Sequence, residues 1–266
     1  MLTRRTRAVS GLASVVLLGG LLAGCGGAAE SSTPPVPPAS VGTHLNAPMA
    51  ASVMSLPLTD EQGRTVRLGD LDNQVVVLYP AMTTCAADCP LDTANIVTAA
   101  RAVDAAGLSK KVTFLSLTID PAQDTPRRMT AFRKLYAAPG QLPNWNLVTG
   151  SQEEIAAIWK YLGVYFKKVS IDEQPAPKDW LTGKPLTYDI EHADEVFLLD
   201  GKGRERFVIS GHANVPDHKA IPTKLRGFLD EQGNQHLNHP GFGSWTPSDV
   251  LQAVSWLTGR EVTLQH

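Results

Sequence analysis

The most informative segment of the chain is residues 75–90, which read Val75-Val76-Val77-Leu78-Tyr79-Pro80-Ala81-Met82-Thr83-Thr84-Cys85-Ala86-Ala87-Asp88-Cys89-Pro90. Its first five residues form a continuous apolar run, which is typical of a strand buried on both faces of a sheet. Pro90 suits the first position of a helix and favours an extended conformation at Cys89, which would make Cys89 the cap residue. Open α/β sheets present their functional sites at such strand-to-helix loops. The segment therefore predicts an α/β fold with its chemistry at Cys85 and Cys89.

Outward from this segment, strand and helix signals alternate over residues 48–266, which indicates a single α/β domain. Glycine-containing turns at 60–63 and 200–203 predict two hairpins, the first of them N-terminal. The insertion expected at 212–246 contains four histidines and precedes the last helix. We predict strands over 53–58, 65–68, 75–79, 112–119, 146–148, 196–199 and 206–209, and helices over 90–107, 126–136, 151–163 and 246–259.

The N-terminus resembles a bacterial lipoprotein signal. Three arginines precede an uncharged stretch, Ala8 to Ala29, that contains Leu22-Ala23-Gly24-Cys25. The alternative, an uncleaved membrane-spanning helix, needs about 20 consecutive apolar residues, and this run is shorter and holds several glycines. We expect residues 1–24 to be a signal peptide, Cys25 to be lipidated, and residues 25–47, rich in Pro, Ser and Gly, to form a tether. The domain would then lie in the cell envelope, anchored to the membrane and facing outward.

Composition excludes one broad class of partner. The chain is 43% hydrophobic and 19% charged, which suits a folded core. Its formal charge is −2. Without Arg4, Arg5 and Arg7 there remain 21 basic against 26 acidic side chains, which gives −5. A mildly acidic domain lacks the clustered basic residues that hold nucleic acid, so no nucleic-acid partner is expected.

The two cysteines that remain after Cys25 admit several interpretations. A thiol at a helix N-terminus gains thiolate character, which makes it both a nucleophile and a soft metal ligand. A structural disulfide is disfavoured because closing so short a loop removes little entropy from the unfolded chain. A redox-active dithiol and a metal site remain, and spacing alone does not separate them.

Three blocks taken together resemble the Sco (SenC) family of cytochrome c oxidase assembly proteins. The first is Cys85-Ala86-Ala87-Asp88-Cys89-Pro90, the second runs from Leu117 to Pro126, and the third joins Tyr188-Asp189-Ile190-Glu191-His192 to the strand ending at Asp200-Gly201. They occur in the family's order and extend over roughly residues 51–211 plus the last helix.

The resemblance implies a thioredoxin-like fold and one copper ion held by Cys85, Cys89 and His192. It implies delivery of copper to, or reduction of the cysteines of, the dinuclear copper site of cytochrome c oxidase. The partners would be the copper-site subunit of that oxidase, other copper chaperones or thioredoxin-like reductants. Thiolates favour Cu(I), while imidazole suits both copper oxidation states; zinc is the other metal such ligands accept. The alternative is an enzyme, a thiol-disulfide oxidoreductase that uses the Cys85/Cys89 pair without a stable metal role.

Some features depart from the family or stay open. Ala86 and Ala87 replace the Pro-Asp that often follows the first cysteine, and the stretch between Gly163 and His192, with Trp180, is long.

The insertion carries four histidines, which are candidates for a second copper site or a docking loop, although solvated loop histidines are commoner. Asp120 and Asp124 could be an acid–base pair or part of a turn in which Asp124 or Thr125 caps the next helix. The four insertion histidines are His212, His218, His236 and His239.

Overall fold

The computed structural model describes residues 33–172 and 175–265, and the signal and lipidation predictions for residues 1–24 and Cys25 lie outside them. At its centre is an eight-stranded mixed sheet with strand order β1-β10-β9-β4-β5-β6-β2-β3. β4, β5 and β6 run parallel, and the other pairings are antiparallel. The strands are β1 (Thr43–Pro48), β2 (Leu58–Asp60), β3 (Thr65–Val66), β4 (Val75–Ala81), β5 (Val112–Thr118), β6 (Trp145–Thr149), β9 (Glu195–Leu199) and β10 (Arg204–Ser210).

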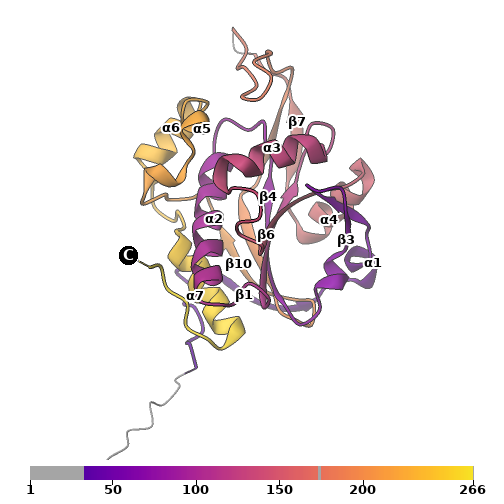
Figure 1. The fold of residues 1–266 in the computed structure, drawn as a ribbon, viewed down its shortest axis with the longest axis vertical. Coiled ribbons are helices and arrows are strands. Elements are labelled where there is room, and N and C mark those ends of the chain that lie inside the picture. The colour runs from indigo at the N-terminus through magenta and orange to yellow at the C-terminus, as the bar shows by residue number, and fades with distance from the viewer. Residues whose placement is uncertain (1–32, 173–174, 266) are drawn as a thin grey trace, which may run out of the picture. The chain divides into compact units, whose positions relative to one another are not determined.

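Helices cover both faces of this sheet (Figure 1). Alternate residues of β4 point to opposite faces, and every one of them is buried. Val77 and Tyr79 pack with the face covered by α2 (Cys89–Ala105), α3 (Pro126–Tyr136) and α7 (Pro247–Thr258). Val76 and Leu78 pack with the face covered by α1 (Ala51–Met54) and α4 (Gln152–Leu162). The continuous apolar run is thus explained by burial on both sides, and the predicted α/β class is confirmed.

Helix boundaries follow local sequence closely. Thr125 caps α3 by accepting a hydrogen bond from the backbone N–H of Arg128. Ser151 and Glu154 form the predicted capping box of α4, which ends at Gly163 in the left-handed conformation. Thr246 and Asp249 form the capping box of α7. Within the described residues, no helix is both long and apolar enough to cross a membrane.

Two N-terminal predictions are corrected. Residues 51–54 form the short helix α1, so the first strand of the predicted hairpin starts at Leu58 rather than at residue 53. Residues 43–47, assigned above to the tether, belong to β1, which pairs with β10 at the edge of the sheet. Its side chains are mostly exposed, and the strand forms through backbone pairing rather than an apolar pattern.

Two additions to the sheet surround the cysteine-bearing end of β4. The first is a separate two-stranded antiparallel sheet of β7 (Phe166–Val169) and β8 (Asp189–His192), called here the β7–β8 hairpin. The second is the expected insertion, which is folded. It contains η2 (His218–Ala220), α5 (Thr223–Arg226) and α6 (Glu231–Asn238). Another short helix, η1 (Leu68–Leu71), precedes β4.

Candidate metal centre

The cysteine loop, residues 82–88, joins β4 to α2. Helix α2 starts at Cys89, with Asp88 as its N-cap residue in the helical region at φ −88° and ψ −31°. The prediction that Cys89 is an extended cap residue is therefore off by one position. The backbone N–H of Cys89 donates a hydrogen bond to Sγ of Cys85 at 3.4 Å. Cys85 thus lies at the positive end of a 17-residue helix, where thiolate character is favoured.

His192 reaches the same point from a distant part of the chain. It is the last residue of β8 and pairs with Phe166 of β7. Its Nε2 lies 3.4 Å from Sγ of Cys89. The ligand atoms of Cys85, Cys89 and His192 all lie within 4.8 Å of one another, and the described residues contain no other group of three His, Cys, Asp or Glu side chains so arranged.

The other nitrogen of His192 sets the orientation of its ring. Nδ1 lies 3.2 Å from the carbonyl oxygen of Ala193 and 3.3 Å from Oδ1 of Asp194. The Ala193 carbonyl oxygen only accepts, so Nδ1 carries a proton and donates it there, while the nearby Asp194 carboxylate favours the protonated ring electrostatically. The lone pair of a neutral ring then resides on Nε2, which faces the sulfurs. Sequence reasoning missed Asp194, although a carboxylate two positions after a candidate ligand is a signal for this role.

Burial and mutual contact shape the acidity of the three groups. Cys85 is 8% and Cys89 1% exposed, and both are free thiols. The hydrogen bond from the Cys89 thiol outweighs burial and, together with His192 and the Cys89 backbone N–H, lowers the pKa of Cys85 to about 7, while the same contact between the two thiols, with burial, raises the pKa of Cys89. Burial would lower the pKa of His192, but Cys85 and Asp194 raise it to about 9. The metal-free centre therefore favours a thiolate beside an imidazolium.

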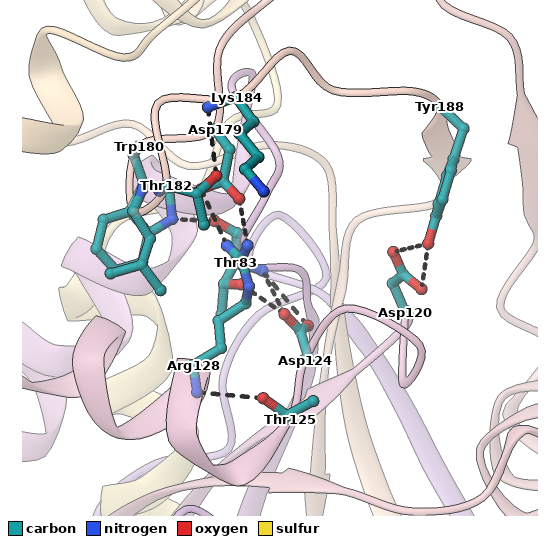
Figure 2. A network of polar contacts seen from close by, with 11 residues as sticks. Thr83, Asp120, Asp124, Thr125, Arg128, Asp179, Trp180, Thr182, Lys184 and Tyr188 are labelled. Carbon is teal, nitrogen blue, oxygen red and sulfur yellow. Dashed lines mark hydrogen bonds and ion pairs between the residues drawn. The ribbon is translucent and has the colours of Figure 1, made fainter.

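The start of the cysteine loop is fixed by a buried polar network (Figure 2). The Thr83 hydroxyl donates to Oδ1 of Asp124 at 2.5 Å, and the Thr118 hydroxyl donates to Oδ2 at 2.6 Å. Burial raises the pKa of Asp124 to about 6 in spite of these donors. The indole N–H of Trp180 donates to the Thr83 carbonyl oxygen at 2.6 Å. Asp124 is thus a structural support of the loop.

Figure 2 also shows how the long stretch before His192 is held. Asp179, next to Trp180, forms a buried ion pair with Arg128 of α3. Farther along, the Tyr188 hydroxyl donates to both carboxylate oxygens of Asp120, at 2.9 and 3.1 Å. Asp120 and Asp124 therefore bind different partners, which favours the structural interpretation over a catalytic pair. Both contacts place the β7–β8 hairpin and His192 relative to the sheet.

The insertion histidines take other roles. His212 and His236 stack, with ring centroids 4.0 Å apart and planes 8° from parallel. Ring lone pairs lie in the ring planes, so stacked rings do not converge on one ion. Nδ1 of His236 instead donates to Oδ1 of Asp88 at 2.6 Å. His218 begins η2, and His239 is the cap residue at the end of α6.

A mixed α/β sheet that carries a dithiol after its central strand β4, with the imidazole of His192 brought to it by β8, defines the class of protein. The SCO1/SenC family model matches residues 47–227, and the chain belongs to this family. The mitochondrial SCO2 homolog of Bos taurus is 28% identical over 146 residues, which are 55% of this chain and 49% of the relative. The chain thus spans about half the length of the curated relative it matches.

Solved structures similar to this chain include two bacterial family members. ScoI of Bradyrhizobium japonicum, solved with copper bound, is 22% identical with a TM-score of 0.46, and the match covers 71% of this chain and 99% of that one. A SCO1/SenC family lipoprotein of Bacillus anthracis is 24% identical with a TM-score of 0.48, covering 65% and 92% of the two chains.

Proposed function

We propose that this protein binds one copper ion through Cys85, Cys89 and His192, and delivers it to the dinuclear copper site of cytochrome c oxidase or prepares the cysteines of that site. The observation that carries the proposal is the convergence of two sulfurs and one imidazole nitrogen within 4.8 Å. Membership of the SCO1/SenC family and the copper bound in the Bradyrhizobium japonicum structure support it.

The donor set suits a copper ion that is held and then passed on. Thiolate sulfur favours Cu(I), and imidazole binds either oxidation state. Three protein ligands leave room for a ligand from the acceptor, so the ion can be exchanged without release into water. The residues of this chain hold and orient the cargo, with Nδ1 of His192 kept as a donor by the Ala193 carbonyl oxygen and the ring placed at ion-pair distance from Asp194. The acceptor in this proposal is the copper-site subunit of the oxidase.

The location of the protein in the cell is also part of the proposal. Lipidation of Cys25 would anchor the domain to the membrane, and residues between Cys25 and β1 would hold it away from the surface. The domain would then face outward in the cell envelope, where its oxidase partner and other copper chaperones or thioredoxin-like reductants could reach it.

A second candidate function uses the same thiols. The contact between the backbone N–H of Cys89 and Sγ of Cys85 favours a thiolate at Cys85. That thiolate could attack a partner disulfide, and Cys89 would then displace the partner from the mixed disulfide. Cys85 and Cys89 end as a disulfide and the partner gains both electrons, with two protons, as a dithiol. This would be a thiol-disulfide oxidoreductase.

Anaerobic titration of the reduced chain with Cu(I) tests the leading proposal, with competition by a Cu(I) chelator to measure affinity. We expect one tightly bound ion, which His192→Ala weakens by at least a hundredfold, while His218→Ala leaves binding unchanged. Reduction of a test disulfide by Cys85 and Cys89 should survive His192→Ala. A wild-type chain that binds no copper but still reduces the disulfide would contradict the copper proposal and favour the oxidoreductase.

A further inference from the structure

Helix α6 lies against the cysteine loop but outside the part of the chain that the family model matches, which ends at residue 227. The backbone N–H of Asp230, its N-cap residue, donates to the carbonyl oxygen of Ala86 at 3.0 Å. The loop thus has a support that the matched family region does not supply.

Asp88 is the main polar link between the loop and α6. Its Oδ1 accepts from Nδ1 of His236 at 2.6 Å, and its Oδ2 accepts from Nε2 of Gln232 at 3.1 Å. Both carboxylate oxygens are therefore bound by one helix. Because Asp88 directly precedes Cys89, these hydrogen bonds hold the residue that joins the loop to α2.

Gly233 allows the helix to approach the loop backbone closely. A Cβ atom at this position would lie 2.7 Å from the carbonyl oxygen of Ala86 and 2.8 Å from that of Ala87. Both atoms belong to the backbone, so neither can turn away as a flexible side chain could. Any residue larger than glycine must push α6 and the loop apart.

The loop is therefore held from two sides. Ile190 of the β7–β8 hairpin packs with both cysteines in the core cluster on one face of the sheet. Leu237 of α6 packs in the cluster on the opposite face. In this closed arrangement the sulfurs are almost fully buried. Buried thiols react through local opening, whose frequency depends on the contacts that hold the segment shut.

We propose that α6 is a clamp on the cysteine loop and sets how fast Cys85 and Cys89 become accessible to another molecule. Asp88, His236 and Gly233 act as positioning residues. Where copper is bound, the clamp also sets the rate at which an acceptor can take the ion, a consequence that rests on the proposed function.

Site-resolved alkylation of the reduced, metal-free full chain tests the clamp, with labelling of the cysteine peptides followed by mass spectrometry. Gly233→Ala should raise the alkylation rate of Cys85 and Cys89 by about tenfold or more, because its Cβ separates helix and loop. Gly227→Ala is the matched control: the nearest atom to its added Cβ is 3.7 Å away, so the rate should not change.

Variants of His236 address the hydrogen bond to Asp88 separately from the glycine contact. His236→Phe keeps a ring to stack on His212 but loses the donor to Asp88, so alkylation should accelerate. His236→Gln keeps a donor and should restore part of the wild-type rate. The urea unfolding midpoints of all variants are also measured. A merely structural defect would shift the midpoint, and His236→Gln would not restore it. Wild-type alkylation rates in Gly233→Ala and His236→Phe would overturn the proposal.

Copper transfer gives a separate readout. The rate at which a chelator removes Cu(I) should rise in the variants whose alkylation rate rises. If the wild-type chain binds no copper, the proposed function fails while the alkylation result still decides the clamp. If copper binds but both rates match the wild type in every variant, the clamp fails and the copper proposal stands.

Discussion

Nε2 of His192 lies 3.4 Å from Sγ of Cys89, although 103 positions separate the two residues. The contact depends on the β7–β8 hairpin, on the long stretch held by Trp180 and Asp179, and on the bond between Tyr188 and Asp120. The centre is therefore a product of tertiary structure, and changes away from the ligands should alter it in measurable ways.

Asp194→Asn should weaken copper binding about tenfold, less than loss of His192 itself, because carboxylate partners of ligating histidines orient the ring and raise its basicity. Oδ1 of Asp194 lies 3.3 Å from Nδ1 of His192. Chelator competition measures the affinity. Asp189→Asn, an exposed position at the other end of β8, is the control. Equal affinities of Asp194→Asn and the wild type would show that Ala193 alone orients the ring.

Tyr188→Phe should lower the free energy of unfolding by about 1 kcal/mol, because the buried carboxylate of Asp120 loses a hydrogen-bond donor. Urea denaturation measures this loss, and hydrogen exchange of the β8 amides should become faster. Tyr165→Phe removes a hydroxyl from a side chain that is more than half exposed, and its stability should stay unchanged. Unchanged β8 exchange in Tyr188→Phe would mean that this bond does not hold the hairpin.

Asp124 should make stability depend on pH between about 4 and 7. Burial raises its pKa from 3.8 to about 6 in the folded protein. An acid whose pKa is higher in the folded state than in the unfolded state stabilises the folded protein most at pH values below its unfolded pKa. This stabilisation is lost as pH rises through the folded pKa. A shift from 3.8 to about 6 corresponds to about 3 kcal/mol.

The isosteric variant Asp124→Asn isolates this effect, because an amide does not titrate in this range. The stability of the wild type relative to the variant should fall as pH increases from 4 to 7, as measured by urea denaturation at each pH. Thr98→Val, at a partly buried hydroxyl on α2, should keep the pH profile of the wild type. A constant difference between wild type and Asp124→Asn would place the folded pKa of Asp124 near its ordinary value.

The core of the fold could be predicted because its signals are local. The apolar run of β4, Pro90 near the start of α2 and the capping box at Ser151 each depend on neighbours in sequence. β1 was missed because Thr43–Pro48 lies at the sheet edge with exposed side chains, so no apolar pattern marks it. Val53 and Met54, read as the beginning of a strand, carry apolar side chains that suit a short helix as well, and the structure forms the helix.

The candidate centre was only partly readable from the sequence. Proximity in the chain linked Cys85 to Cys89, whereas His192 was singled out through the family resemblance. The contact of Asp88 with His236 spans 148 positions and follows from the close fit of Gly233 on two carbonyl oxygens. Such a fit depends on backbone placement, and no composition or spacing signals it.

The two supports of the cysteine loop both come late in the polypeptide, which has a consequence for biosynthesis. A chain made from its N-terminus presents the paired thiols long before the imidazole that completes their site, and α6 emerges later still. The nascent dithiol is thus without His192 until most of the domain has been synthesised. Under the proposed function, copper binding through all three residues therefore follows folding of the β7–β8 hairpin.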